Sequence, residues 1–348
     1  MKLTPGEIYF IGERDHLTGQ QTSFYKIGIV RADDRRSSQD RMSEHQTGNP
    51  RPLFLHTIVK TEVVERIETL LHRQFAQNRV VGEWFNFEDL KLEEAVRACT
   101  ELAQEAAEQA PLFAEAIRLK SEYSNEVIIP ATDEAREWFN RLLTAELTVK
   151  KFKEVDAKIR GAVREAIQAG ESVGGVARER KKTMKEVFNQ KRFKEEQAAL
   201  FAKYEEIAKS FGGSFLLKRP NDLSEFESKL NDKVAPLIQQ IEVDIDRAVA
   251  GEIPKSDLGN WHLIILENIG MAEWEVEIAA ARLRVLVGVN QGIEGICTWK
   301  RQDKVKKVFN QERFRDENFD LYKSYVELTE VGGGLLMEAG QAAAEVEA

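Results

Sequence analysis

The fold is decided by two apolar runs, Gly6-Glu7-Ile8-Tyr9-Phe10-Ile11-Gly12 and Phe24-Tyr25-Lys26-Ile27-Gly28-Ile29-Val30. Both runs are rich in β-branched and aromatic residues, and a polar connection with one glycine separates them at residues 13–21. This pattern predicts an antiparallel hairpin with a long loop.

The residues that follow extend the hairpin into a small mixed domain. A short helix is expected after an N-cap at Asp34 or Ser37, and Gly48-Asn49-Pro50 ends it. Residues 52–60 form a third strand, residues 62–77 an amphipathic helix, and residues 84–87 a closing extended element. For residues 1–90 we predict an α+β fold, a three-stranded antiparallel sheet with flanking helices.

We call residues 1–90 the head and residues 91–348 the tail. The tail has helical sequence patterns. Long helices are predicted for residues 92–124 with a break at Pro111, for 133–170, for 223–251 with a kink at Pro236, and for 256–289. The tail is therefore expected to be mostly α-helical.

The tail also contains an internal repeat with an offset of 121 residues. The run Val187-Phe188-Asn189-Gln190-Lys191-Arg192-Phe193 recurs as Val308-Phe309-Asn310-Gln311-Glu312-Arg313-Phe314. Repeated units usually bury their apolar faces against each other. We predict a helical linker at residues 91–130, one repeat at 131–218, a second at 219–348, and a pseudo-twofold arrangement of the two.

Composition bounds the function. The net charge is −9, but residues 1–90 carry 12 Lys and Arg against 13 Asp and Glu, so the acidic excess lies in the tail. A nearly neutral head can bind phosphates through a local arginine cluster, whereas a broad non-specific DNA clamp is not expected. No apolar run is long enough to span a membrane, the first residues do not resemble a signal peptide, and two distant cysteines fit a reducing cytoplasm.

Candidate site residues lie in the head. Tyr9 and Lys26 are on predicted strands beside glycines, and Arg41 and His45, four residues apart, share a helix face. Glu68 borders the apolar stripe of its helix, where a carboxylate is costly to desolvate without a cation. Taken singly, these features are more typical of hairpin packing, of a solvated pair and of a rim glutamate paired with Arg41 than of a catalytic site.

Together and in this order, they resemble the GIY-YIG nuclease superfamily. The closest resemblance is to its phage and prophage branch, in which the second half-motif reads Lys-Ile-Gly. It covers residues 6–88 and depends on Tyr25-Lys26-Ile27-Gly28, Gln46-Thr47-Gly48-Asn49-Pro50 and Gly82-Glu83-Trp84-Phe85.

The resemblance implies a role for each candidate. Tyr9, with His45, would activate water, and Arg41 would meet the charge that grows on the phosphate. Glu68 would hold one Mg²⁺ or Mn²⁺, mostly with water ligands, to stabilise the leaving oxygen.

Lys26 departs from the superfamily, which has a second tyrosine at this position. Neighbouring residues of a strand face opposite sides of the sheet, so Tyr25 cannot replace it and Lys26 faces the site. A lysine is compatible with a phosphate contact or proton transfer, and also with a domain that binds nucleic acid but cuts it poorly.

Basic residues outside this set are candidates for nucleic-acid contacts. In the head these are Arg35 and Arg36; in the tail, two tracts at equivalent places of the repeats supply Lys181, Lys182, Lys300 and Arg301. The alternative is a solvated surface, and the nearby phenylalanines are either stacking platforms or core. Gly295-Ile296-Cys297-Thr298-Trp299-Lys300 and the residues after it resemble the C-terminal segment of YqaJ-type phage exonucleases, which implies a phage background.

These observations predict a metal-dependent DNA endonuclease whose helical tail selects a target or a partner. The alternatives are a weakly catalytic module that uses the head to dock nucleic acid or protein, and a tail that is itself the functional part. The long helices are compatible with a homodimer or with a protein partner of the tail.

Overall fold

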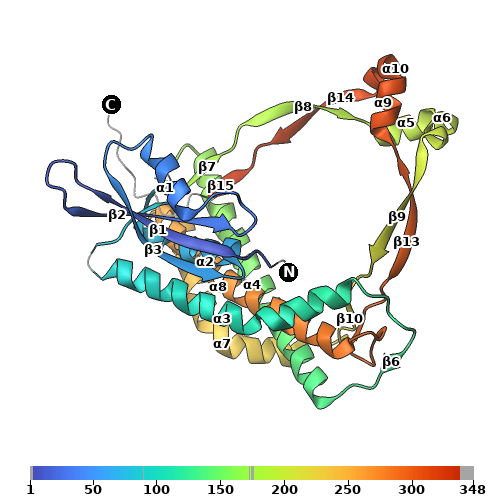
Figure 1. Ribbon diagram of the computed structural model, residues 1–348, viewed down its shortest axis with the longest axis horizontal. Coiled ribbons are helices and arrows are strands. Elements are labelled where there is room, and N and C mark those ends of the chain that lie inside the picture. Colours follow the sequence, from blue (N-terminus) through green and yellow to red (C-terminus); the bar gives the residue numbers. More distant parts are fainter. Residues whose placement is uncertain (1–2, 89, 172, 174–175, 338–348) are drawn as a thin grey trace.

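The head is built on one antiparallel sheet, seen at the left of Figure 1. The computed structural model describes residues 3–88, 90–171, 173 and 176–337. The strands are β1 (Gly6–Arg14), β2 (Gln21–Arg31), β3 (Leu53–Thr61), β4 (Arg79–Val81) and β5 (Trp84–Asn86), in the order β3-β1-β2-β5-β4. The helices are α1 (Ser38–Gln46) and α2 (Val64–Gln74), followed by the 3₁₀ turn η1 (Ala76–Asn78).

The predicted three-stranded sheet is wrong in its strand number. Strand β5 pairs with β2, and β4 pairs with β5 to close a hairpin. Gly82 lies at the turn with a φ of +56°, a conformation that favours glycine, and Phe85 is fully buried. The tight turn and the burial of Phe85 together extend the sheet by two strands.

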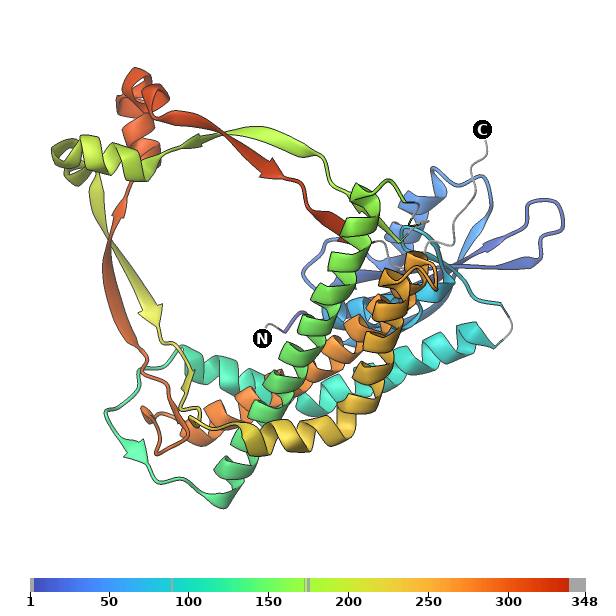
Figure 2. The same ribbon diagram turned by 180° about the vertical axis from the view of Figure 1, so that it is seen from behind.

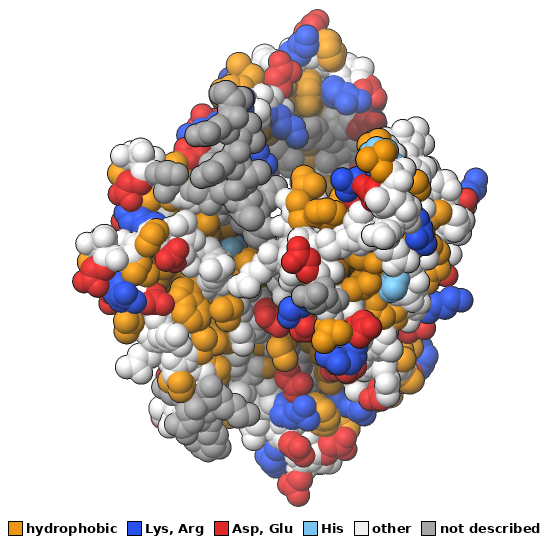
Figure 3. All heavy atoms as spheres, turned by 90° about the vertical axis from the view of Figure 1, so that its left-hand side faces the viewer, with side chains coloured by type: hydrophobic (Ala, Val, Ile, Leu, Met, Phe, Trp, Pro, Cys, Tyr) orange, Lys and Arg blue, Asp and Glu red, His pale blue; other side chains and the backbone are white. Residues whose placement is uncertain are grey.

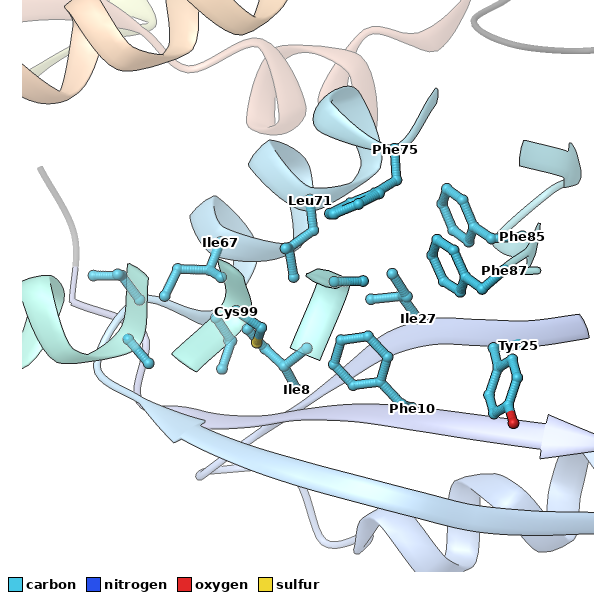
Figure 4. Packing of buried hydrophobic residues seen from close by; sticks show 14 of the residues in the cluster. Ile8, Phe10, Tyr25, Ile27, Ile67, Leu71, Phe75, Phe85, Phe87 and Cys99 are labelled. Atoms are coloured by element: carbon cyan, nitrogen blue, oxygen red, sulfur yellow. The ribbon is translucent and has the colours of Figure 1, made fainter. Parts of the chain in front are cut away.

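The sheet buries both faces with a period of two. One face presents Ile8, Phe10 and Ile27 to α2 and to the following helix, as Figure 4 shows. The other places Tyr9 and Ile11 in a second apolar cluster with residues of α1 and β3. Because this alternation is regular, the parity of a strand position decides whether its side chain enters the main core or the α1 side.

Helix α3 (Lys91–Lys120) is continuous through Pro111, so the predicted break is wrong. Leu112 and Phe113, the residues after the proline, are buried against helix α8 (Leu258–Val287) of the tail, and this packing outweighs the loss of one helical hydrogen bond. The first half of α3 places Ala95 in the core of the head. Cys99 lies in the same core, as Figure 4 shows.

Three long helices form the base of the tail: α4 (Asp133–Gln168), α7 (Ser224–Val249, with Pro236 inside) and α8 (Leu258–Val287). Helices α4 and α8 occupy equivalent places in the repeat. They pack antiparallel, since Phe152 and Ile159 share a core with Ile265 at one end, and Leu142 shares another with Leu283 at the opposite end. No helix in the described ranges is long and apolar enough to cross a membrane.

Two arms rise from this base and meet at a tip, in the hoop seen in Figures 1 and 2. Arm 1 (residues 182–212) consists of β8 (Lys182–Phe188), α5 (Gln190–Glu196), α6 (Ala198–Lys203) and β9 (Glu205–Gly212). Arm 2 (residues 302–332) has the same order: β13 (Gln302–Phe309), α9 (Gln311–Glu317), α10 (Phe319–Ser324) and β14 (Val326–Gly332).

The strands of the arms pair between the two arms, not within one. Strand β8 pairs with β14 and β9 with β13, which gives two antiparallel ribbons of two strands each. The expectation of long helices throughout the repeats is therefore incomplete, because the basic tracts lead into strands. At the tip, Phe188, Phe193, Phe309 and Phe314 form one aromatic core.

Short elements complete the tail. Strands β6 (Ile128–Ile129), β10 (Leu216–Leu217), β11 (Gly292–Ile293) and β12 (Cys297–Thr298) form a small sheet in the order β10-β12-β11-β6. Strand β7 (Ala177–Glu179) pairs with β15 (Leu335–Met337), and η2 (Lys255–Asp257) precedes α8.

Candidate active site

Tyr9 lies at the centre of the site, on the middle strand of the sheet. It pairs across the ladder with Gly28, and a Cβ at residue 28 would lie 2.4 Å from the Tyr9 hydroxyl. Glycine is therefore required at position 28 for the ring to lie where it does. The side chain of Tyr9 is 1% exposed, so water and ligands meet its neighbours first.

Helix α1 covers Tyr9 with two of its side chains. The helix begins with a capping box between Ser37 and Asp40, which fixes its first turn. Further along the helix, the Nε2 of His45 lies 3.5 Å from the Tyr9 hydroxyl. Arg41 acts on the same hydroxyl, and its Nη1 also donates to Glu44 at 2.6 Å.

The surroundings of Tyr9 and His45 shift their pKa values in opposite directions. Burial raises the pKa of Tyr9, and the hydrogen bond from Arg41 opposes the rise without cancelling it. Burial lowers the pKa of His45, and the charges of Lys26 and Arg41 lower it further. At neutral pH the hydroxyl keeps its proton and the imidazole is neutral, so His45 is able to accept a proton.

Lys26 reaches the site from β2 and forms an ion pair with Glu83, at the turn between β4 and β5. The Lys26 side chain is 8% exposed and that of Glu83 is 46% exposed. Tyr25 points to the other face of the sheet, into the main core of the head, as strand alternation predicts. Sequence reasoning missed Glu83 as a site residue, because the Gly82-Glu83-Trp84-Phe85 motif does not reveal which cation the carboxylate meets.

Glu68 approaches the same place from α2. Its neighbours Ile67 and Leu71 anchor the helix in the core, which leaves Glu68 at the rim. Burial raises the pKa of Glu68 to about 7; the charge of Glu83 adds to the rise, and that of Lys26 opposes it. The ion pair with Arg41 considered above is absent from the described contacts, in which Arg41 bonds Glu44.

His72, one turn after Glu68, is a positioning residue that was not predicted as part of the site. Its Nε2 donates to the carbonyl of Ile27 at 3.2 Å, which joins α2 to β2. Burial lowers the pKa of His72 to about 4, so the ring is neutral over the physiological range.

The donor set fits one hard cation held mostly by water. The described residues contain no group of three or more His, Cys, Asp or Glu side chains placed to hold a metal. Glu68 supplies carboxylate oxygens of the kind that Mg²⁺ prefers, and a cation there would relieve both its burial and the nearby charge of Glu83. The prediction of a metal at Glu68 stays a prediction.

A recess of about 690 Å³ opens beside this face of the sheet and is lined by Glu7, Arg31, Arg35, Arg36 and Lys60, among others. Glu7 precedes Tyr9 by two residues, so both lie on the α1 side of the sheet. Arg36 bonds Glu44 at 3.2 Å. On the face shown in Figure 3, basic and acidic side chains are interspersed without a continuous basic field.

The four basic tail residues predicted to contact nucleic acid lie in different environments. Lys181 and Lys300 are exposed, and Lys182 forms an ion pair with Glu330 at 2.9 Å. Arg301 is completely buried, and its guanidinium donates to the carbonyls of Leu119 and Gly288. The prediction that Arg301 contacts nucleic acid is therefore wrong. The phenylalanines of the tip are core residues and are not available for stacking on bases.

Comparison with family models found a similarity within the head. Residues 6–103 match the T5orf172 domain, a nuclease-associated domain. The match extends into α3, in agreement with the packing of Ala95 and Cys99 in the core of the head. Searches of curated proteins and of solved structures found no match.

Proposed function

We propose that the head is a metal-dependent DNA endonuclease of the GIY-YIG type that hydrolyses phosphodiester bonds. The observation that carries the proposal is the convergence of Tyr9, Lys26, Arg41, His45 and Glu68 from two strands and two helices. These groups act on one another's pKa values, and they lie within a domain whose match is nuclease-associated.

In this proposal each residue has a task. Neutral His45 accepts the proton of the attacking water, and Tyr9 orients the ring through its hydroxyl. Arg41 stabilises the negative charge that develops on the phosphate. Mg²⁺ or Mn²⁺ held by Glu68 and water would supply Lewis-acid stabilisation of the leaving oxygen.

The state of Lys26 bears on the choice between a nuclease and a weakly catalytic module that docks nucleic acid. Because Glu83 already neutralises the ammonium group, Lys26 is not a free catalytic cation while the pair holds. This pair, with the near-complete burial of Tyr9, favours a second candidate, a weakly catalytic module that docks nucleic acid. In the enzyme, incoming phosphate would compete with Glu83 for Lys26.

The test is cleavage of supercoiled plasmid and labelled oligonucleotides with Mg²⁺ or Mn²⁺. Wild type is compared with Glu68→Ala and Arg41→Ala, and with the matched controls Glu93→Ala and Arg97→Ala on the exposed surface of α3. We expect the two site variants to lose at least a hundredfold in rate, on the order of one electrostatic contact to the transition state, and the controls to cut like wild type. Equal cleavage by all five proteins would remove this site, and cleavage by none would favour the docking module.

The same proposal has the enzyme acting in the cytoplasm, in a phage or mobile-element setting. The tail would select the DNA target, a partner protein or a second copy of the chain. Size measurement in solution at several concentrations tests the homodimer.

A further inference from the structure

The two ribbons of the hoop share a design but differ in charge. The offset of 121 residues places β13 on β8 and β14 on β9, so residues 303–309 and 205–211 of one ribbon correspond to residues 182–188 and 326–332 of the other. On ribbon β9/β13, lysines stand at positions 209, 304, 306 and 307. Their counterparts on ribbon β8/β14 are Glu330, Thr183, Lys185 and Glu186.

The charges at position 303 and at its counterpart 182 reduce this difference in charge but do not cancel it. Asp303 adds one negative charge to ribbon β9/β13, and its counterpart Lys182 adds one positive charge to the other ribbon. Over these five positions, ribbon β9/β13 carries four lysines and one aspartate, while ribbon β8/β14 carries two lysines and two glutamates. Beyond these positions, Glu205 and Glu206 belong to ribbon β9/β13 and Glu327 to ribbon β8/β14, so the first carries four positive and three negative charges and the second two positive and three negative. Glu206 is contacted by Asn310 and Arg313 at the tip. Ribbon β9/β13 is therefore the more basic of the two.

The lysines of ribbon β9/β13 are free to meet a ligand. All four are exposed, and within the part of the chain that the structure describes none of them has an ion-pair partner. By contrast, Lys182 on the other ribbon bonds Glu330, and Asp303 is held by the hydroxyl of Tyr123 at 2.9 Å. Mutual repulsion among the four unpaired lysines costs stability, and an anionic ligand would remove that cost.

One face of the ribbon is shaped for close approach. Lys304 pairs across the ladder with Ser210, and Lys306 pairs with Ala208, so each lysine lies beside a small residue. The two lysines are two residues apart and project from the same face about 7 Å from each other. A two-stranded ribbon of this kind is narrow enough to enter the major groove of DNA.

No structural task explains these residues. The tip is held by its aromatic core, and the base by the packing of α4 against α8. Between them, residues 302–308 of β13 are exposed on both faces, and Ile207 and Val305 are 66% and 64% exposed. A ribbon so exposed on both faces is a common place for recognition.

We propose that ribbon β9/β13 binds the sugar-phosphate backbone of duplex DNA, with Lys304 and Lys306 as phosphate contacts and Lys307 and Lys209 flanking them. The choice of DNA over an acidic protein rests on the function proposed for the head. Ribbon β8/β14 supports the tip and does not contribute to this binding.

The chain supplies its own matched control. The test variant is Lys304→Gln with Lys306→Gln, and the control is Lys182→Gln with Lys185→Gln on the equivalent ribbon. Binding of the full chain to a fluorescein-labelled mixed-sequence duplex of about 30 base pairs, long enough for a complete site, is measured by anisotropy. EDTA is present so that no cleavage occurs, and thermal melts establish that both variants are folded.

We expect the test variant to bind more weakly at low salt and to show a slope of log K against log salt that is shallower by about 1.8, as two lost phosphate contacts require. Its affinity gap to wild type should shrink about tenfold between 50 and 200 mM salt. The control variant should bind like wild type. Wild-type binding by the test variant, the result expected of an acidic-protein site, would overturn the proposal, and so would equal losses in both variants.

Cleavage of the same duplex with Mg²⁺, measured in parallel, separates this proposal from that for the head. Weakened binding by the test variant without any cleavage by wild type leaves the ribbon site standing and removes the nuclease. Normal cleavage by wild type with unchanged binding by the test variant removes the ribbon site alone.

Discussion

At the residue scale, the site depends on a glycine, Gly28, because its lack of a side chain leaves room for Tyr9. The Tyr9 ring lies directly over Gly28, in the space that any other residue would fill. The half-motif Lys26-Ile27-Gly28 thus combines a charged group aimed at the site with the gap that admits the tyrosine.

Gly28→Ala should displace Tyr9 and impair cleavage more than folding. The added methyl group would lie 2.4 Å from the hydroxyl, and overpacking of this kind costs about 1–3 kcal/mol. Cleavage rate and urea unfolding measure the two effects. Gly48→Ala is the control, because a Cβ at residue 48 meets no heavy atom within 4 Å. Full activity of Gly28→Ala would show that the position of Tyr9 does not matter.

Glu68 makes the stability of the head depend on pH. Its pKa is raised by burial to about 7, so the folded state holds this proton more tightly than the unfolded chain does. The carboxyl group is neutral and costs nothing well below its ordinary pKa of about 4.3. Its penalty develops as pH rises toward 7 and is complete above 7.

Glu68→Gln should therefore raise the melting temperature much more at pH 8, where the whole penalty is present, than at pH 5, where only a small part of it has developed. Thermal melts in EDTA at both values, with Glu93→Gln as the exposed control, measure this. A Glu68→Gln protein that is less stable than wild type at pH 8 would contradict the assignment of an uncompensated carboxylate.

At the element scale, α2 connects the site to the tail. Its inner face enters the core through Ile67 and Leu71, while Glu68 faces the site. On another side of the helix, Arg66 donates to the carbonyl of Gly270 at 2.7 Å and lies over the ring of Trp274. One helix thus carries both the candidate metal ligand and the contact with α8.

The contact between α4 and α8 contains a buried polar pair, Asp156 and His262. Burial alone would raise the pKa of Asp156, but hydrogen bonds from His262 and Arg160 lower it below its ordinary value. The carboxylate therefore adds stability above the unfolded pKa of Asp, and this contribution is lost as pH falls through the lower folded value.

Asp156→Asn should destabilise the protein at pH 7 by about 2–4 kcal/mol, because it leaves the buried His262 and the partly exposed Arg160 without an anionic acceptor. Chemical unfolding at pH 7 and at lower pH measures this, and the exposed Asp246→Asn is the control. The loss should shrink as the pH falls below the unfolded pKa of Asp, about 3.9. A difference from wild type that stays constant with pH would show that the charge of Asp156 is not the cause.

At the scale of the whole molecule, each ribbon needs both arms. An isolated pair of strands is only marginally stable in water. Here the ribbons are held at one end by the base and at the other by the tip, where Phe193 of arm 1 and Phe314 of arm 2 have ring centroids 4.4 Å apart. Both phenylalanines are fully buried, and they occupy equivalent places in the repeat.

Phe193→Ala and Phe314→Ala should destabilise the hoop equally, each by about 3–5 kcal/mol, since each removes the same contact from a symmetric core. Hydrogen exchange should rise in both ribbons together while the core of the head stays protected. Loosening of one ribbon alone, or costs that differ more than twofold, would show that the two arms do not act as a unit.

The sequence by itself determined the elements and the candidate residues. Local periodicity located the first three strands, α1, α2 and the long helices, because the burial of one face imposes a period of 2 or 3.6 on the chain. The match of residues 6–103 to a nuclease-associated domain agrees with the prediction of a nuclease-type head, and the finer resemblance to the GIY-YIG superfamily stays a prediction. Lys26 and Tyr25 lie on opposite faces of the sheet, as strand geometry requires.

Only the tertiary structure decided which side chains meet. The partner of Lys26 is 57 residues away at Glu83, and the strands of each arm pair with those of the other arm. Arg301, basic in sequence, is buried because three backbone carbonyls accept its hydrogen bonds. Periodicity records which face of an element is buried but not what covers it, and the pairing of distant groups depends on packing that no local pattern encodes.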